Sequence, residues 1–132
     1  IGGGCVRGRD SGLSICLPSS PTGCAHLTNH RLDEAEYRTT DELADGLIIT
    51  PCLYFYRSFC VTFEDEAQLT STRHDIGIGN LVWGNDYPHH DSIWPHSMRT
   101  LDEVLAGVPD NERQAMVWDN VMGLYNIDQT KL

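Results

Sequence analysis

Short apolar runs alternate with helical segments over much of the chain, and this order constrains the fold most. Residues 47–51 (LIITP) and 81–83 (LVW) are apolar runs, and residues 58–63 are rich in Phe, Val and Thr. Residues 66–75 have the composition of a short helix, and a further short helix can begin near residue 52. Strand and helix alternation is typical of βαβ units, which place their strands in a parallel sheet. We therefore expect an α/β fold.

Two further helices are predicted in the last third of the chain. Residues 98–106 follow Ser97, a suitable N-cap, and residues 111–125 carry an apolar stripe formed by Val117, Val121, Leu124 and Tyr125. Two or three strands are too few to close a barrel or to make a covered doubly wound sheet. The chain is therefore expected to be part of a larger α/β domain.

The N-terminal part has a different composition. Residues 1–25 are rich in Gly, Ser and Pro and show no period, so we expect an irregular segment there. Residues 26–46 are charged, contain good helix formers and end at Gly46, which predicts a helix with a thin apolar stripe. We divide the chain into the irregular segment 1–25 and an α/β part, 26–132.

Charge and cysteine content restrict the partners. Nine Lys and Arg against nineteen Asp and Glu give 132 residues a net charge of −10, which argues against nucleic-acid binding. No apolar run is long enough for a membrane span. The five cysteines are odd in number, are scattered and form no CxxC pair. We interpret them as free thiols, which predicts a reducing compartment and a cytoplasmic location.

A dense polar block follows the run LVW directly. Residues 85–96 (NDYPHHDSIWPH) hold two Asp and three His: Asp86, His89, His90, Asp91 and His96. The carboxyl ends of strands are where α/β folds place functional groups. Carboxylate and imidazole suit zinc and other first-row divalent ions. The alternative for Asp86 is a turn residue that bonds its own backbone.

The same residues resemble a known family. LVWGNDYPHHDSIWPHS (residues 81–97) resembles the last barrel strand and following loop of the amidohydrolase-related family, the amidohydrolase 2 group. PCLYFYRSFCVTFEDE (51–66) is similar to its segment P-S-x-Y-F…V-T-F-E-D-D, and RHDIGIGNLVWGNDYPH (73–89) to R…I-G-x-D-N-L-x-W-x-S/N-D-Y-P-H. LAGVPDNERQAMVWDNVMGLYNID (105–128) resembles L-x-G-V-P-x-x-E-R…N-x-x-x-L-Y. The resemblance spans about residues 30–128 in the family's motif order.

The resemblance implies a TIM-barrel enzyme that depends on a divalent metal. Asp86 matches the family's Asp that closes the metal site from the eighth strand, as a ligand or as proton acceptor for metal-bound water. Zinc is the first choice, with manganese and magnesium as alternatives. Family members hydrolyse C–N, C–O or C–C bonds, or decarboxylate aromatic acids, so the expected substrate is a small molecule. They often dimerise, so a homo-oligomeric parent protein is expected.

This chain also departs from the family pattern. The H-x-H or E-x-H pair of the first strand and the His of a middle strand have no counterpart here. We therefore expect the C-terminal part of a (β/α)8 barrel, its last two or three strands with their helices, that is inactive alone. The alternatives are a small module that binds metal through the His/Asp loop, and a truncated non-catalytic product. Loop neighbours rarely all reach one ion, which disfavours the module.

Further roles are assigned within the polar block. His89 is the second catalytic candidate, which faces the substrate or supports Asp86, while His90 is expected to be solvated. Asp91 and Ser92 are expected to shape the loop. The remaining expectations are packing at Trp94, with the rim of a substrate mouth as the alternative, and a cap or contact with the next helix at His96.

Outside the block, packing or capping is favoured over chemistry. The acidic run Glu64–Glu66 is expected to cap the following helix, with a solvated strand end and a second metal site as the alternatives. Tyr54 and Tyr56 are expected to pack, whereas Arg57 is left open as a ligand for an acidic group. Packing is also expected for Trp83 in the barrel wall and for three residues of the last helix: Trp118, Met122 and Tyr125.

Overall fold

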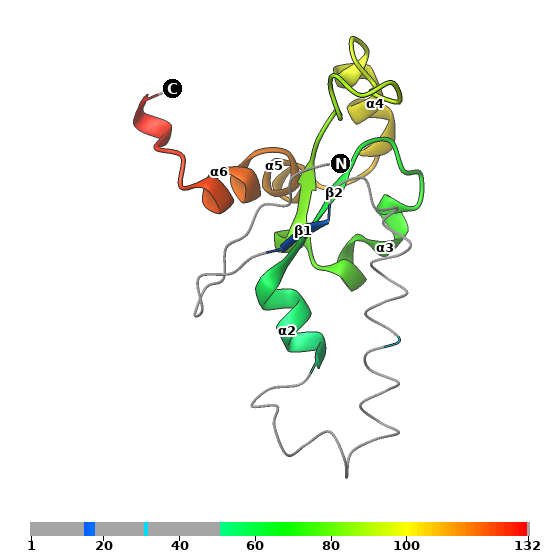
Figure 1. The fold of residues 1–132 in the computed structure, drawn as a ribbon. Coiled ribbons are helices and arrows are strands. Elements are labelled where there is room, and N and C mark those ends of the chain that lie inside the picture. The colour runs from blue at the N-terminus through cyan, green and yellow to red at the C-terminus, as the bar shows by residue number, and fades with distance from the viewer. Residues whose placement is uncertain (1–14, 18–30, 32–50, 132) are drawn as a thin grey trace.

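A computed structural model describes residues 15–17, 31 and 51–131, with a short parallel sheet at its centre (Figure 1). Strands β1 (Ile15–Leu17), β2 (Phe59–Phe63) and β3 (Leu81–Trp83) lie in the order β1-β2-β3, and both pairings are parallel. The two later strands coincide closely with the predicted runs 58–63 and 81–83. The predicted parallel pairing is therefore confirmed.

Strand β1 corrects the prediction for the N-terminal segment. Ile15 pairs with Phe59 and Leu17 with Val61, so residues 15–17 are part of the sheet and not irregular. A three-residue strand is too short to show a period, and it is surrounded in the sequence by turn-forming residues. It could therefore not be recognised from the sequence. The predicted helix 26–46 lies outside the described residues except at Arg31, which is helical.

Three helices and a 3₁₀ turn connect the strands and follow them. Helix α2 (Pro51–Ser58) precedes β2, and α3 (Leu69–Ile76) with η1 (Ile78–Asn80) lies between β2 and β3. Helix α4 (Ser97–Val104) follows the polar block. Pro51 opens α2, as its fixed φ allows at a first helical position. The apolar run predicted at 47–51 thus ends in a helix, and residues 47–50 lie outside the described part.

Helix α4 begins one residue earlier than predicted. Its N-cap residue is His96, whose side chain makes no capping hydrogen bond, and Ser97 is the first helical residue. The side chain of Ser97 is buried, and its hydroxyl lies 3.5 Å from Asn85 Nδ2, a donor in the polar block. The serine therefore serves the loop and not the helix end.

The last predicted helix, 111–125, is confirmed as one continuous helical segment with a π turn inside it. It consists of α5 (Asp110–Gln114), the π segment η2 (Ala115–Asp119) and α6 (Asn120–Tyr125), and the 3₁₀ turn η3 (Gln129–Lys131) follows. A π turn uses extra residues and rotates the buried face. Met116 and Met122 are consequently buried, whereas Trp118 and Tyr125 are exposed. The packing prediction was right for Met122 and wrong for those two aromatic residues.

The hydrophobic core forms around one face of the sheet. Val61, Phe63 and Leu81 are fully buried, and Val61 pairs with Leu81 in the register. The cluster is completed by helix and loop residues: Phe55, Leu69, Ile76, Leu101, Leu105, Val108 and Met116. Trp83 packs against this cluster, as predicted. No helix in the described ranges has the length and apolar character needed to cross a membrane.

Strands β2 and β3 end at the same edge, and this brings the acidic run and the polar block together. The amide of Gly84 donates to the carbonyl of Phe63 over 3.0 Å, so the chain after β3 continues beside the end of β2. A Cβ on Gly84 would lie 3.4 Å from Cγ2 of Thr62, which indicates a close approach. Figure 1 shows the loop and α4 beyond this end of the sheet and α2 beyond the other.

Candidate functional site

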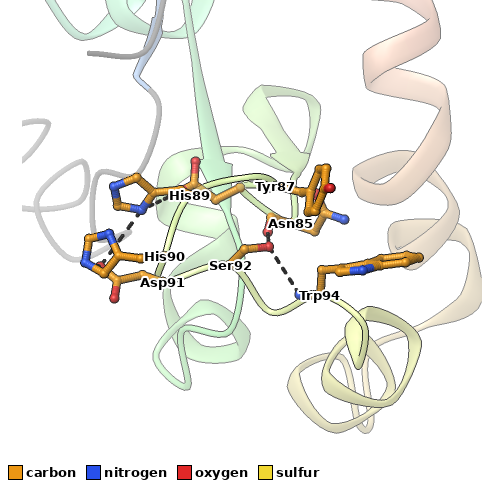
Figure 2. A network of polar contacts seen from close by, with 8 residues as sticks. Asn85, Tyr87, His89, His90, Asp91, Ser92 and Trp94 are labelled. Atoms are coloured by element: carbon orange, nitrogen blue, oxygen red, sulfur yellow. Dashed lines mark hydrogen bonds and ion pairs between the residues drawn. The ribbon is translucent and has the colours of Figure 1, made fainter.

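Asn85 and Ser92 fix the shape of the loop that follows β3. The hydroxyl of Ser92 donates to the carbonyl of Asn85 over 2.5 Å and accepts from the amide of Trp94 over 3.2 Å. The amide of Tyr87 donates to Oδ1 of Asn85 over 3.2 Å. These bonds close the loop upon itself, so Ser92 shapes the loop as its position predicted (Figure 2).

Asp86 occupies a turn position that side chains rarely adopt. Its φ is +52°, in the left-handed region that costs most residues energy and that Asp and Asn tolerate best. Its Oδ2 lies 3.1 Å from Nδ1 of His89, and its carbonyl accepts the amide of the same residue over 2.8 Å. The alternative role for Asp86 is that of a turn residue. The main-chain carbonyl of Asp86 does accept a turn hydrogen bond, from the amide of His89. The carboxylate itself faces an imidazole.

Two histidines and an aspartate gather on one side of the loop. Nε2 of His90 lies 3.1 Å from Oδ2 of Asp91, and the same oxygen lies 4.0 Å from Nδ1 of His89. The two imidazole rings are 4.3 Å apart between centroids and tilted by 49°. In Figure 2 these three side chains point to one side of the loop, away from Tyr87 and Trp94.

Tyr87 and Trp94 form an exposed aromatic pair on the other side. Their ring centroids are 6.0 Å apart in an edge-to-face arrangement, and both side chains are largely exposed. The expected packing of Trp94 takes the form of a surface contact with Tyr87, and the indole remains 60% exposed.

Glu64 joins this site from the neighbouring strand end. Burial raises the pKa of its carboxyl to about 7, and the negative charges of Asp86, Glu66, Asp65 and Asp91 add to this effect in decreasing order. The pKa shift shows that the end of β2 and the loop after β3 share one electrostatic environment. The sequence predicts a helix cap at this residue, whereas the parallel pairing of β2 and β3 places it beside the loop that follows β3.

The predicted capping role of the acidic run is wrong. Helix α3 has Gln68 as its N-cap residue and no side-chain capping bond. Glu66 instead accepts the amide of Glu64 on Oε2 over 2.8 Å, which closes the end of β2. Two residues, Ala67 and Gln68, separate Glu66 from Leu69, the first residue of the helix, and the Glu66 carboxylate bonds the end of β2.

Other residues singled out from the sequence lie apart from the site or take other roles. The hydroxyl of Tyr56 donates to the carbonyl of Asp75 over 2.8 Å, which is a structural bond. Arg57 is exposed on α2, at the opposite end of the sheet from the loop. The indole N–H of Trp83 is buried and has no acceptor within the described part of the chain. The side chain of Tyr54 lies outside the described part.

Cys60 corrects the prediction of free thiols. This residue is buried in β2 and is disulfide-bonded. The scatter and the odd number of cysteines indicated free thiols. Spacing along the chain does not reveal which cysteines the fold brings together, so this pattern could not exclude a disulfide. For Cys60 the prediction is wrong.

No protein-family model matches the chain, and no curated protein matches it in sequence. The family resemblance of residues 30–128 therefore rests on the motifs alone.

Proposed function

We propose that the chain is the C-terminal part of a divalent-metal-dependent hydrolase of the amidohydrolase-related type, with Asp86 at its metal site. The observation that supports this most directly is the position of Asp86. Its carboxylate follows a parallel strand, faces His89 at 3.1 Å and shares the field of Glu64 on the adjacent strand. In barrel enzymes, catalytic groups come from this end of several strands.

The chemistry of the donor set fits a cation. Carboxylate groups on Glu64, Asp86 and Asp91 repel one another strongly enough to contribute to the raised pKa of Glu64. A divalent ion would offset this repulsion, because its charge is the largest in any site that holds one. Zinc is the first choice beside an imidazole, with manganese and magnesium as alternatives.

Each residue has a distinct role in the proposed site. When bound, the ion polarises the substrate and lowers the pKa of a coordinated water. Asp86 ligates the ion or accepts the proton that is released. His89 holds the Asp86 carboxylate in position through Nδ1, and the other ring nitrogen can face a substrate. Glu64 supplies a second carboxyl group from the neighbouring strand end, within the electrostatic field of Asp86.

The wider proposal follows the family resemblance. The substrate is a small molecule, and decarboxylation by a carboxy-lyase of the same family is the alternative to hydrolysis. The exposed pair Tyr87 and Trp94 offers an apolar rim beside the loop for an aromatic substrate. The parent protein is a homo-oligomer in this proposal, whereas the cytoplasmic location expected from free thiols loses that support because Cys60 is disulfide-bonded. The 132-residue chain alone is inactive, because the ligands expected from other strands are missing.

The test is the intact mass and metal content of the protein purified from its source. We expect a species heavier than 14.8 kDa that contains a bound divalent ion and whose upstream peptides carry an H-x-H or E-x-H strand. Asp86→Asn in that protein should lower its metal content and its turnover, whereas His96→Gln, on the same loop, should not.

Three results would count against the proposal. One is a natural product of 14.8 kDa. Another is a longer protein whose metal content is the same with Asp86→Asn as without it. The third is robust metal-dependent turnover by the isolated 132-residue chain.

A further inference from the structure

Three consecutive residues of the loop bring their donor atoms together without help from any other element. His89, His90 and Asp91 each offer one ligand atom, and these atoms lie within 4.8 Å of one another. Consecutive residues of an extended chain point in different directions, and for this reason the sequence disfavoured a site built from them alone. The loop instead turns at this point, where the amide of Ser92 donates to the carbonyl of His89 over 3.1 Å.

We propose that His89, His90 and Asp91 form a zinc-binding site of their own, separate from the role of Asp86. Two imidazoles and one carboxylate are a ligand set that zinc accepts, with water in the fourth position. Zinc bonds of about 2.0–2.2 Å in a tetrahedral site place ligand atoms roughly 3.3–3.5 Å apart. The distances of 3.1 Å and 4.0 Å from Asp91 Oδ2 to the two histidines bracket this separation.

Because the three side chains are exposed, they can move to zinc-ligand geometry with little disturbance of the fold. The side chains of His89, His90 and Asp91 are 53%, 79% and 73% exposed, so none is wedged in the core. A rotation of such a side chain between staggered positions disturbs no packed neighbour. The ion can also approach directly from solvent, without opening of the fold.

The local charge favours a cation at this place. Asp86 and Asp91 both contribute to the negative field that reaches Glu64, and the whole chain has a net charge of −10. In the metal-free arrangement, Nδ1 of His89 lies nearer to Asp86, at 3.1 Å, than to Asp91, at 4.0 Å. Zinc on this nitrogen would displace the contact with Asp86, so binding by the triplet and support of Asp86 by His89 are alternative states of one histidine.

Selectivity distinguishes this site from a general attraction of cations. Imidazole nitrogens suit zinc, whereas magnesium prefers oxygen ligands and keeps its water. Magnesium is thus the control ion for the triplet, because electrostatic attraction alone would hold both ions. A site with two of its three ligands on adjacent histidines should discriminate strongly between them.

The experiment is a calorimetric titration of the full 132-residue chain with zinc chloride, repeated with magnesium chloride. We expect one zinc ion per chain at this site and no competition from a moderate excess of magnesium. Loss of a residue that merely supports a ligand costs about 10–100-fold in metal affinity, so His90→Gln should weaken zinc binding at least tenfold. Asp91→Asn should also weaken it.

His96→Gln is the matched control, because His96 is an exposed histidine near the same loop but outside the triplet. Its affinity for zinc should equal that of the unchanged chain. Ring-proton NMR signals of His89 and His90 should move on addition of zinc, while that of His74, on α3, should stay in place. Circular dichroism checks that each variant keeps its fold.

The proposal fails if His90→Gln and His96→Gln bind zinc equally well. It also fails if Asp86→Asn abolishes zinc binding while His90→Gln leaves it intact, since zinc would then belong to the Asp86 site. That second result would leave the proposed hydrolase function standing, and the two proposals can therefore be separated.

Discussion

The carboxyl group of Glu64, at the end of β2, lies in the electrostatic field of Asp86, which follows β3. The charge of Asp86 is the largest Coulombic contribution to the raised pKa of Glu64, after the effect of burial. Because the strands are parallel neighbours, two acidic groups 22 residues apart in sequence end at one edge of the sheet. This relationship can be tested in the protein without any substrate or metal.

Asp86→Asn should lower the pKa of Glu64 toward its ordinary range. The substitution removes the largest of the like charges that act on Glu64, and asparagine tolerates the positive φ at this position, so the loop keeps its shape. Carbon-detected NMR titration of the Glu64 carboxyl, in the presence of a chelator, measures the shift. Asp110→Asn, at an exposed position of α5, is the control and should leave the pKa unchanged. Equal values in both variants would contradict the inferred proximity.

Glu64→Gln should stabilise the protein above neutral pH and have little effect in acid. The folded-state pKa of Glu64 is about 7 and its ordinary value is 4.5, so between these values the folded state keeps a proton that the unfolded state releases. Stability from this group is therefore full below pH 4.5 and declines as the pH rises to about 7. Glutamine carries no charge and is spared this loss.

Urea unfolding of the parent and of Glu64→Gln measures this difference at about pH 5 and pH 8, close to the two ends of the range over which Glu64 loses its proton. We expect the variant to gain about 1 kcal/mol at pH 8, well below the full value of the shift because Glu64 is partly solvated. Glu103→Gln, on an exposed face of α4, should show no such pH dependence. A variant that is less stable than the parent at pH 8 would show that the Glu64 charge is instead favourable.

The sequence predicted the sheet better than the site. Residues 59–63 and 81–83 were recognisable because they are apolar, β-branched or aromatic and are bounded by polar residues. Ile15–Leu17 was missed because a three-residue strand inside a Gly- and Pro-rich segment has no period of its own. Its place in the sheet comes from pairing with Phe59 and Val61, which are more than forty residues away.

Within the site, the proximity of Asp86 and His89 was accessible from their spacing, since i and i+3 residues meet across a tight turn. The convergence of His89, His90 and Asp91 was not accessible. It depends on backbone bonds among Asp86, His89 and Ser92 that only the folded loop contains. The role of Glu66 was misjudged for a similar reason, because a carboxylate can satisfy a strand end as readily as a helix end.

Asn120→Ala should destabilise the protein by about 1–2 kcal/mol. The side-chain amide of Asn120 donates to the carbonyls of Ile78 and Leu81, each over 2.7 Å, and so joins α6 to the start of β3. Asn120 is partly buried, and alanine leaves both carbonyls without this donor. Asn111→Ala, at an exposed position of α5, removes the same amide without such bonds and should change stability by less than about 0.5 kcal/mol.

Urea unfolding at one pH compares the two variants with the parent, and hydrogen exchange at the Leu81–Trp83 amides reports whether β3 loosens. Because β3 leads directly into the loop, we expect faster exchange there in Asn120→Ala. The loss of this anchor should also broaden the NMR signals of Asp86 and His89. If Asn120→Ala and Asn111→Ala were equally stable, the two bonds would contribute nothing net, and apolar packing such as that of Met116 and Val117 would hold the last helix to the sheet.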